Sequence, residues 1–124
     1  MAKISIECAR MPLGGIAQMF EFKWSPAEKV IARQAFDMAL RNELQTTIRE
    51  AKERAARISE PAELWELEDW LTERRQDINR RYDYRYSVLP IVFARLIRDG
   101  RLSEDDLKGL RPEKLELINR GVSF

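Results

Sequence analysis

The apolar residues between positions 26 and 58 recur at intervals of three and four, which is the spacing of one face of an α-helix. These positions are Phe36, Leu40, Leu44, Ile48, Ala51, Ala55 and Ile58. Ser25 is a suitable N-cap, Pro26 suits the first helical position, and Glu28 completes a capping box. No proline or glycine follows until Pro61. The pattern therefore predicts one helix over about 26–58, about 50 Å long.

A helix of this length exceeds the diameter expected for a compact chain of 124 residues. The short helices predicted after it cannot cover its whole apolar face. We expect the same helix of a second copy to cover the rest, which predicts a homodimer. The residues expected in this dimer helix are Phe36, Leu40, Leu44 and Ile48. The alternative is a helix that breaks near Thr46 and Thr47 and folds back as a monomeric hairpin.

A second helix is expected over about 61–81, because Pro61 suits a first helical turn and the apolar residues again follow a helical period. In helical projection these apolar residues fall within an arc of about 60°, which we interpret as the core-facing stripe. The stripe consists of Leu64, Leu67, Leu71 and Ile78. Trp65 lies about 100° away from the stripe. The residues on the side of Trp65 are Glu68, Asp69, Thr72 and Arg75.

The face around Trp65 is the sharpest functional signal in the sequence, because a merely solvated face does not need a tryptophan. Burial in a dimer interface would explain it, since interface cores are enriched in tryptophan and arginine. A binding hot spot for a different protein would also explain it. Both explanations hold together if the partner site straddles the dimer.

The remainder of the chain predicts a small helical head. Residues 87–99 are the most apolar segment and are expected to form its buried helix, with Pro90 in the first turn if Ser87 caps it. Gly100 would end this helix. A short helix is expected from Ser103 to about residue 110, and a last one begins at Pro112. The expected fold class is all-α.

Residues 1–23 differ from the rest, because they alternate like a short strand and then contain a Pro-Leu-Gly-Gly break. We interpret them as a flexible or loosely packed N-terminal extension. The alternative is a strand that pairs with a partner. Residues 24–124 are expected to form a single helical domain.

Composition and charge argue against several classes of function. With 22 basic and 21 acidic residues the net charge is +1, so no general attraction to nucleic acid or an anionic membrane is expected. The arginines at 74–85 alternate with tyrosines, a pattern that can bind single strands, but nearby acids offset their charge. No apolar run approaches the ~18 residues of a membrane span.

The residue types needed for many reactions are missing. The chain contains no histidine, which excludes Ser-His-Asp and Cys-His catalysis and histidine-based metal sites. The acidic cluster at 63–73 is interpreted as a solvated helix face. The single cysteine, Cys8, excludes an intrachain disulfide and fits a reducing compartment. We expect no cofactor and no metal.

An ordered set of motifs resembles the fluorescence recovery protein family of cyanobacteria over about residues 24–120. The motifs are Trp24–Glu28, Leu64–Arg75, Asp77-Ile78, Arg81–Asp83, Ser87-Val88 and Val92–Ala94. The resemblance implies an all-helical, antiparallel homodimer with a long pair of helices and a small helical head, which is not an enzyme. It also implies a regulator that binds photoactivated orange carotenoid protein, favours its return to the inactive form, and helps it leave the phycobilisome. Photoprotective quenching then ends and antenna fluorescence returns.

The resemblance also implies where such a regulator acts and through which residues. The location would be cytoplasmic, compatible with a peripheral position at the thylakoid membrane. The functional patch of the family holds a tryptophan, an aspartate and an arginine that match Trp65, Asp69 and Arg75. Contact by the head would involve Ile91 and Phe93.

Two positions depart from the pattern of the family. Glu68 stands where the family has a histidine, and Ile91 stands where it has an aromatic residue, directly after the unusual Pro90. The sequence therefore indicates a divergent member. The alternative function is a dimeric helical adaptor on the same scaffold with a different protein partner.

Overall fold

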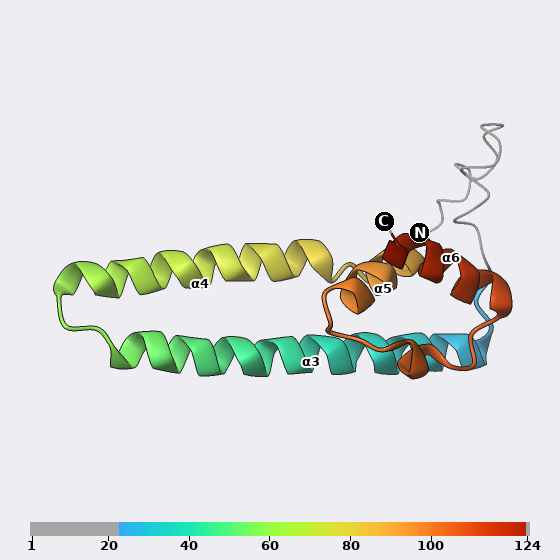
Figure 1. Ribbon diagram of the computed structural model, residues 1–124, viewed down its shortest axis with the longest axis horizontal. Coiled ribbons are helices and arrows are strands. Elements are labelled where there is room, and N and C mark those ends of the chain that lie inside the picture. Colours follow the sequence, from blue (N-terminus) through green and yellow to red (C-terminus); the bar gives the residue numbers. More distant parts are fainter. Residues whose placement is uncertain (1–22, 124) are drawn as a thin grey trace, which may run out of the picture.

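The computed structural model describes residues 23–123, and over that range the chain is helical without strands. Its elements are α3 (Pro26–Ala56), α4 (Pro61–Arg81), α5 (Leu89–Arg98), the 3₁₀ turn η1 (Glu104–Leu107) and α6 (Pro112–Ser123). Helices α3 and α4 run antiparallel as a long hairpin, and the later elements pack near the start of α3 (Figure 1). The predicted N-terminal extension, except for its last residue, lies outside the described residues.

The start of α3 follows the predicted capping box. The Glu28 backbone N–H donates to Ser25 Oγ at 3.2 Å, and the Ser25 N–H donates to Glu28 Oε1 at 3.1 Å. The helix ends at Ala56, two residues before the expected end at 58, and passes through Thr46 and Thr47 without a break. The predicted continuous helix is therefore confirmed, and the alternative of a break at these threonines is wrong.

The bounds of α4 agree with the expected range, and its first turn contains Pro61. In the head, α5 begins with Pro90 in the first turn, but Val88 rather than Ser87 is the N-cap. The proline is tolerated there because a first-turn N–H needs no helical partner. Gly100 ends α5 with a φ of 77°. The short helix expected over 103–110 is only the 3₁₀ turn η1.

The core lies between the first half of α3 and the head. On α3 it is formed mainly by the small residues Ala32, Ala35 and Ala39, which let the head elements approach the helix closely. The head contributes large buried side chains, and those with no exposed surface are Leu89, Phe93, Leu96 and Leu107. Phe36 is 5 % exposed and belongs to this core, so its predicted place in a dimer-facing stripe is corrected.

A buried ion pair ties the start of α3 to α6. Lys114 Nζ lies 3.1 Å from Glu28 Oε2, and each side chain is 3 % exposed. The Arg111 backbone N–H donates to the same carboxylate at 2.9 Å. Burial alone would raise the pKa of Glu28, but hydrogen bonds from Arg111 and Ser25 and the charge of Lys114 lower it to about 2.

The distal part of the hairpin, here called the arm, comprises residues 44–56 of α3 and 61–77 of α4. None of its residues is buried. The stripe predicted on α4 is therefore not a core stripe within this chain: Leu64 is 48 % and Leu71 is 41 % exposed, and only Ile78, just beyond the arm, is buried.

Trp70 connects the two arm helices through cation–π contacts with arginines rather than through an apolar core. The guanidinium carbons of Arg54 and Arg74 lie 4.5 and 5.0 Å from its ring centroid. Arg74 also pairs with Glu50 of α3 at 3.4 Å. These contacts connect the two helices of the arm, while the large apolar side chains of the arm remain exposed to solvent.

A double-mutant cycle tests the contact between Arg54 and Trp70. Arg54→Ala and Trp70→Ala should show a coupling energy of about 0.5–1 kcal/mol, because a cation above an aromatic face contributes this much at partly exposed sites. Urea unfolding at one fixed protein concentration measures it. The matched cycle of Arg54→Ala with Trp65→Ala should show no coupling, and equal coupling in both cycles would contradict the contact.

The buried Glu28 makes stability depend on pH. Its pKa is about 2 in the folded chain against an ordinary value of 4.5, so its contribution is complete above the ordinary value and is lost as the pH falls toward 2. Between about pH 6 and about pH 3 this loss should reach about 2 kcal/mol. Urea unfolding of Glu28→Gln should show a pH dependence smaller by that amount. An unchanged pH dependence would contradict this role of Glu28.

Candidate functional site

A groove of about 600 Å³ lies between α3 and α4 where the arm meets the head. Leu40, Leu44 and Thr47 line it from α3. From α4 it is lined by Glu68, Leu71, Thr72, Arg74, Arg75, Ile78 and Asn79. The helical spacing of three and four places each set on one face of its helix. Five predicted site residues thus meet in one groove, namely Leu40, Leu44, Glu68, Thr72 and Arg75.

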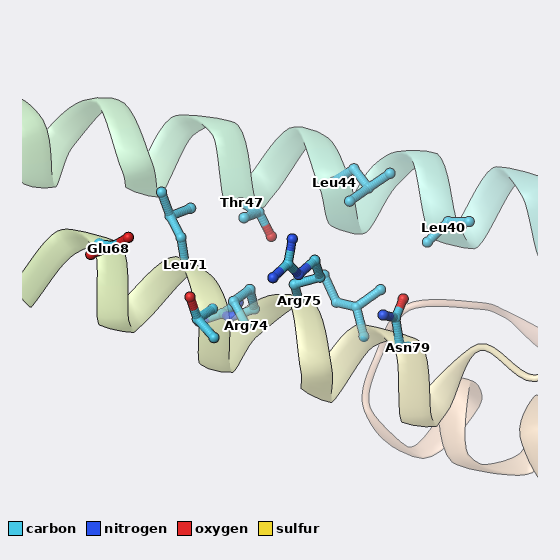
Figure 2. Close-up of a pocket in the computed structure, with 10 residues that line it drawn as sticks. Leu40, Leu44, Thr47, Glu68, Leu71, Arg74, Arg75 and Asn79 are labelled. Carbon is cyan, nitrogen blue, oxygen red and sulfur yellow. The ribbon is translucent and has the colours of Figure 1, made fainter.

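Arg75 is the central polar group of the groove. Figure 2 shows it reaching from α4 toward α3, opposite Thr47, with Leu71 on the same side of α4. It is exposed, and it forms no ion pair among residues 23–123, whereas its neighbour Arg74 is engaged with Glu50 and Trp70. The groove therefore presents a positive charge within an apolar lining.

Trp65 and Asp69 do not line this groove. Trp65 is 61 % exposed and Asp69 is exposed, one helical turn apart on α4. We call the exposed apolar residues of the arm, together with Trp65, the arm surface. It consists of Leu44, Ile48, Leu64, Trp65 and Leu71. The structure thus divides the predicted patch. Glu68, Thr72 and Arg75 line the groove, whereas Trp65 and Asp69 lie outside it.

Sequence reasoning missed a buried carboxylate on α3. Glu43, one residue before Leu44, is 1 % exposed. Arg81 binds it through both terminal nitrogens, and the Tyr82 hydroxyl donates to it at 2.8 Å. Burial alone would raise the pKa of Glu43, but the hydrogen bonds from Arg81 and Tyr82 lower it below its usual value. Burial and this carboxylate together raise the pKa of Tyr82.

The two expected head-contact residues differ in their exposure to solvent. Ile91 is 40 % exposed on α5, whereas Phe93 has no exposed surface and lies in the core. Phe93 therefore cannot touch a partner in this structure, and its assignment as a contact residue is corrected. The helical period separates them, because residues two apart lie on different faces of a helix.

The run of arginines and tyrosines folds back onto the chain. Tyr84 packs edge-on against Phe36 with centroids 4.9 Å apart, and the guanidinium of Arg33 lies 3.8 Å from the Tyr84 ring centroid. Burial and the neighbouring phenol of Tyr86 raise the pKa of Tyr84 to about 12. These tyrosines attach the segment after α4 to α3, so they do not form an open platform for stacking bases.

Residues 23–123 contain no group of three or more acidic or cysteine side chains placed to hold a metal ion. Among the described helices, none combines the length and apolarity needed to cross a bilayer.

Comparisons with known proteins agree with this architecture. Residues 24–120 match the family model described as photoprotection regulator fluorescence recovery protein. The fluorescence recovery protein of Synechocystis sp. is 34% identical over 101 residues, which cover 82% of this chain and 93% of that protein.

Solved structures show the same likeness. The fluorescence recovery protein of Fremyella diplosiphon has a TM-score of 0.78 and 39% identity, covering 82% of this chain and all (100%) of that one. The structure from Synechocystis sp. has a TM-score of 0.78 and 31% identity with the same coverage, 82% and 100%. The chain therefore belongs to the fluorescence recovery protein family of photoprotection regulators.

Proposed function

We propose that the chain acts as a homodimer that binds photoactivated orange carotenoid protein, accelerates its return to the inactive form and helps it leave the phycobilisome. The observation that carries this proposal is the arm surface, which remains uncovered by the chain's own head. The family assignment supports the choice of a carotenoid-binding partner. The activity requires binding alone, without catalysis or a cofactor.

The length of α3 supports the homodimer. With 31 residues the helix is about 46 Å long, and the head covers only its first part. The arm surface leaves large side chains in water, including Ile48 at 53 % and Trp65 at 61 % exposure. Exposed apolar patches of this kind are typical of interaction sites. A second copy of the arm in antiparallel orientation offers the same apolar residues in return.

Two contact regions support the regulatory mechanism. The groove with Arg75 lies at the base of the arm, and Ile91 lies on the separate head. A regulator can only shift a conformational equilibrium by binding one state more tightly than another. Contacts at both regions would hold the two parts of a partner near each other and so favour its compact form. Such a regulator would work in the cytoplasm, at the thylakoid surface when its partner is bound there.

Dark relaxation of photoactivated orange carotenoid protein tests the activity directly. Addition of the protein should accelerate the return of the inactive absorption spectrum, because the complex favours the compact form. Size-exclusion chromatography of the illuminated mixture should show a complex. Unchanged relaxation without a complex would reject this partner and favour the alternative, a dimeric adaptor for a different protein. Glu68 in the groove is the residue that would favour such a change of partner.

Substitutions in the patch test the homodimer. Trp65→Ala or Arg75→Ala should weaken self-association or partner binding by about 1–2 kcal/mol while helicity remains, because both side chains are exposed within the chain. Sedimentation velocity and far-UV circular dichroism measure the two effects. Arg80→Ala, an exposed arginine outside the groove, is the matched control. Loss of helicity in Trp65→Ala would instead indicate a core residue.

A further inference from the structure

Glu43 is a buried carboxylate at which three separate parts of the chain meet. It lies on α3 and is 1 % exposed. Arg81 comes from the end of α4, with Nη1 2.9 Å from Glu43 Oε1, and Tyr82 begins the segment that leads into the head. Arg101 follows α5, and its Nε lies 3.7 Å from the same oxygen. No other described acidic residue contacts side chains from as many parts of the fold.

The partners of Glu43 are themselves held in place. Arg81 also pairs with Asp77 at 3.1 Å, which orients its guanidinium along α4. The Arg101 backbone N–H donates to the Leu96 carbonyl at 2.8 Å, directly after the αL turn at Gly100, so its side chain has a defined position relative to α5. The Glu43 carboxylate therefore contacts two side chains, one positioned by α4 and the other by α5.

The apolar contact between head and α3 defines an orientation less strictly than buried charge pairs do. On α3 it is formed by Phe36 and by the small side chains of Ala32, Ala35 and Ala39. Hydrophobic association is non-directional. Bidentate arginine–carboxylate contacts are directional.

Buried carboxylates attach later parts of the chain at two points of α3. One is Glu28, which binds Lys114 and the Arg111 backbone at the start of α6. The other is Glu43, which binds Arg81 at the end of α4 and pairs with Arg101 of the head. It lies 15 positions further along the helix and therefore about 22 Å away. Two such points restrict the orientation of the head more than one does. Buried ion pairs seldom stabilise a fold more than apolar packing would, which favours a role in specifying geometry.

We propose that Glu43 is a positioning residue that fixes the orientation of the head relative to the arm, and thereby the spacing of the two partner-contact regions. The groove residue Arg75 lies on one side of this junction and Ile91 of α5 on the other. The functional part of this inference rests on the proposed function above. The geometric part concerns the chain alone and stands independently of the partner.

Two variants distinguish an effect on the orientation of the head from an effect on the stability of the fold. Glu43→Gln keeps the shape of the side chain but removes its charge. Glu43→Gln combined with Arg81→Met also removes the Arg81 cation, so that this charge is not left without its buried partner. The matched control is Glu50→Gln, because Glu50 lies on the same helix and pairs with Arg74 of α4 without contacting the head.

Distance measurements between spin labels report the head orientation. Labels at Lys52→Cys on the arm and Asn119→Cys on α6 occupy exposed positions, in a chain with Cys8→Ser and diluted with unlabelled protein. Both Glu43 variants should give a broader or shifted distance distribution with helicity and dimer mass retained. The Glu50→Gln control should keep the distribution of the parent chain. An unchanged distribution in both Glu43 variants would overturn the proposal, and so would loss of helicity in both.

Dark relaxation of photoactivated orange carotenoid protein tests the functional part. The Glu43 variants should accelerate relaxation about tenfold less than the parent chain, since small misplacements of contact groups reduce rates this strongly. Altered distances with full acceleration would refute the functional part. If the parent chain itself does not accelerate relaxation, the proposed function fails, whereas the distance measurement still decides the role of Glu43.

Discussion

The organisation of this chain depends on one continuous helix that serves two different environments. The 31 residues of α3 run without a break, and the chain's own head covers only the first part. Small alanines form the covered face, whereas Leu44 and Ile48 are exposed on the uncovered half. Because the helix cannot bend back on itself, the arm must project beyond the head (Figure 1). The arm surface follows directly from this constraint.

Apolar packing and buried charged groups make different contributions to this fold. The apolar core gives the head its cohesion, since Leu89, Phe93 and Leu96 are completely buried. The carboxylate of Glu28 connects that head to α3 through Lys114, and the carboxylate of Glu43 connects α3 to Arg81 of α4 and to Arg101 of the head. In the arm, where no apolar core exists, Trp70 and its flanking arginines take over the connection between the two helices.

Membership of the fluorescence recovery protein family explains why a small protein leaves so much apolar surface exposed. A regulator that works through binding needs surfaces that remain free of its own core. Glu68 lines the groove about two helical turns from Arg75, and Ile91 is exposed on α5, so the two positions expected to depart from the family pattern are both accessible.

Local signals in the sequence were sufficient for the helices themselves. Ser25, Glu28 and the prolines at 26, 61 and 112 marked the helix starts, because capping and proline geometry depend only on neighbouring residues. The all-α class followed from them. Helical period alone also identified five of the residues that share the groove, since it states which residues lie on one face.

Burial was decided only by the tertiary structure. Phe36 and Leu44 belong to the same periodic pattern, yet one lies in the head core and the other on the exposed arm, because the head ends between them. Phe93 was expected at a surface and no sequence pattern singled out Glu43, yet both are completely or almost completely buried. A periodic pattern shows which face of a helix is apolar. What covers that face, and which charged groups become enclosed with it, depends on segments that lie far away in the sequence.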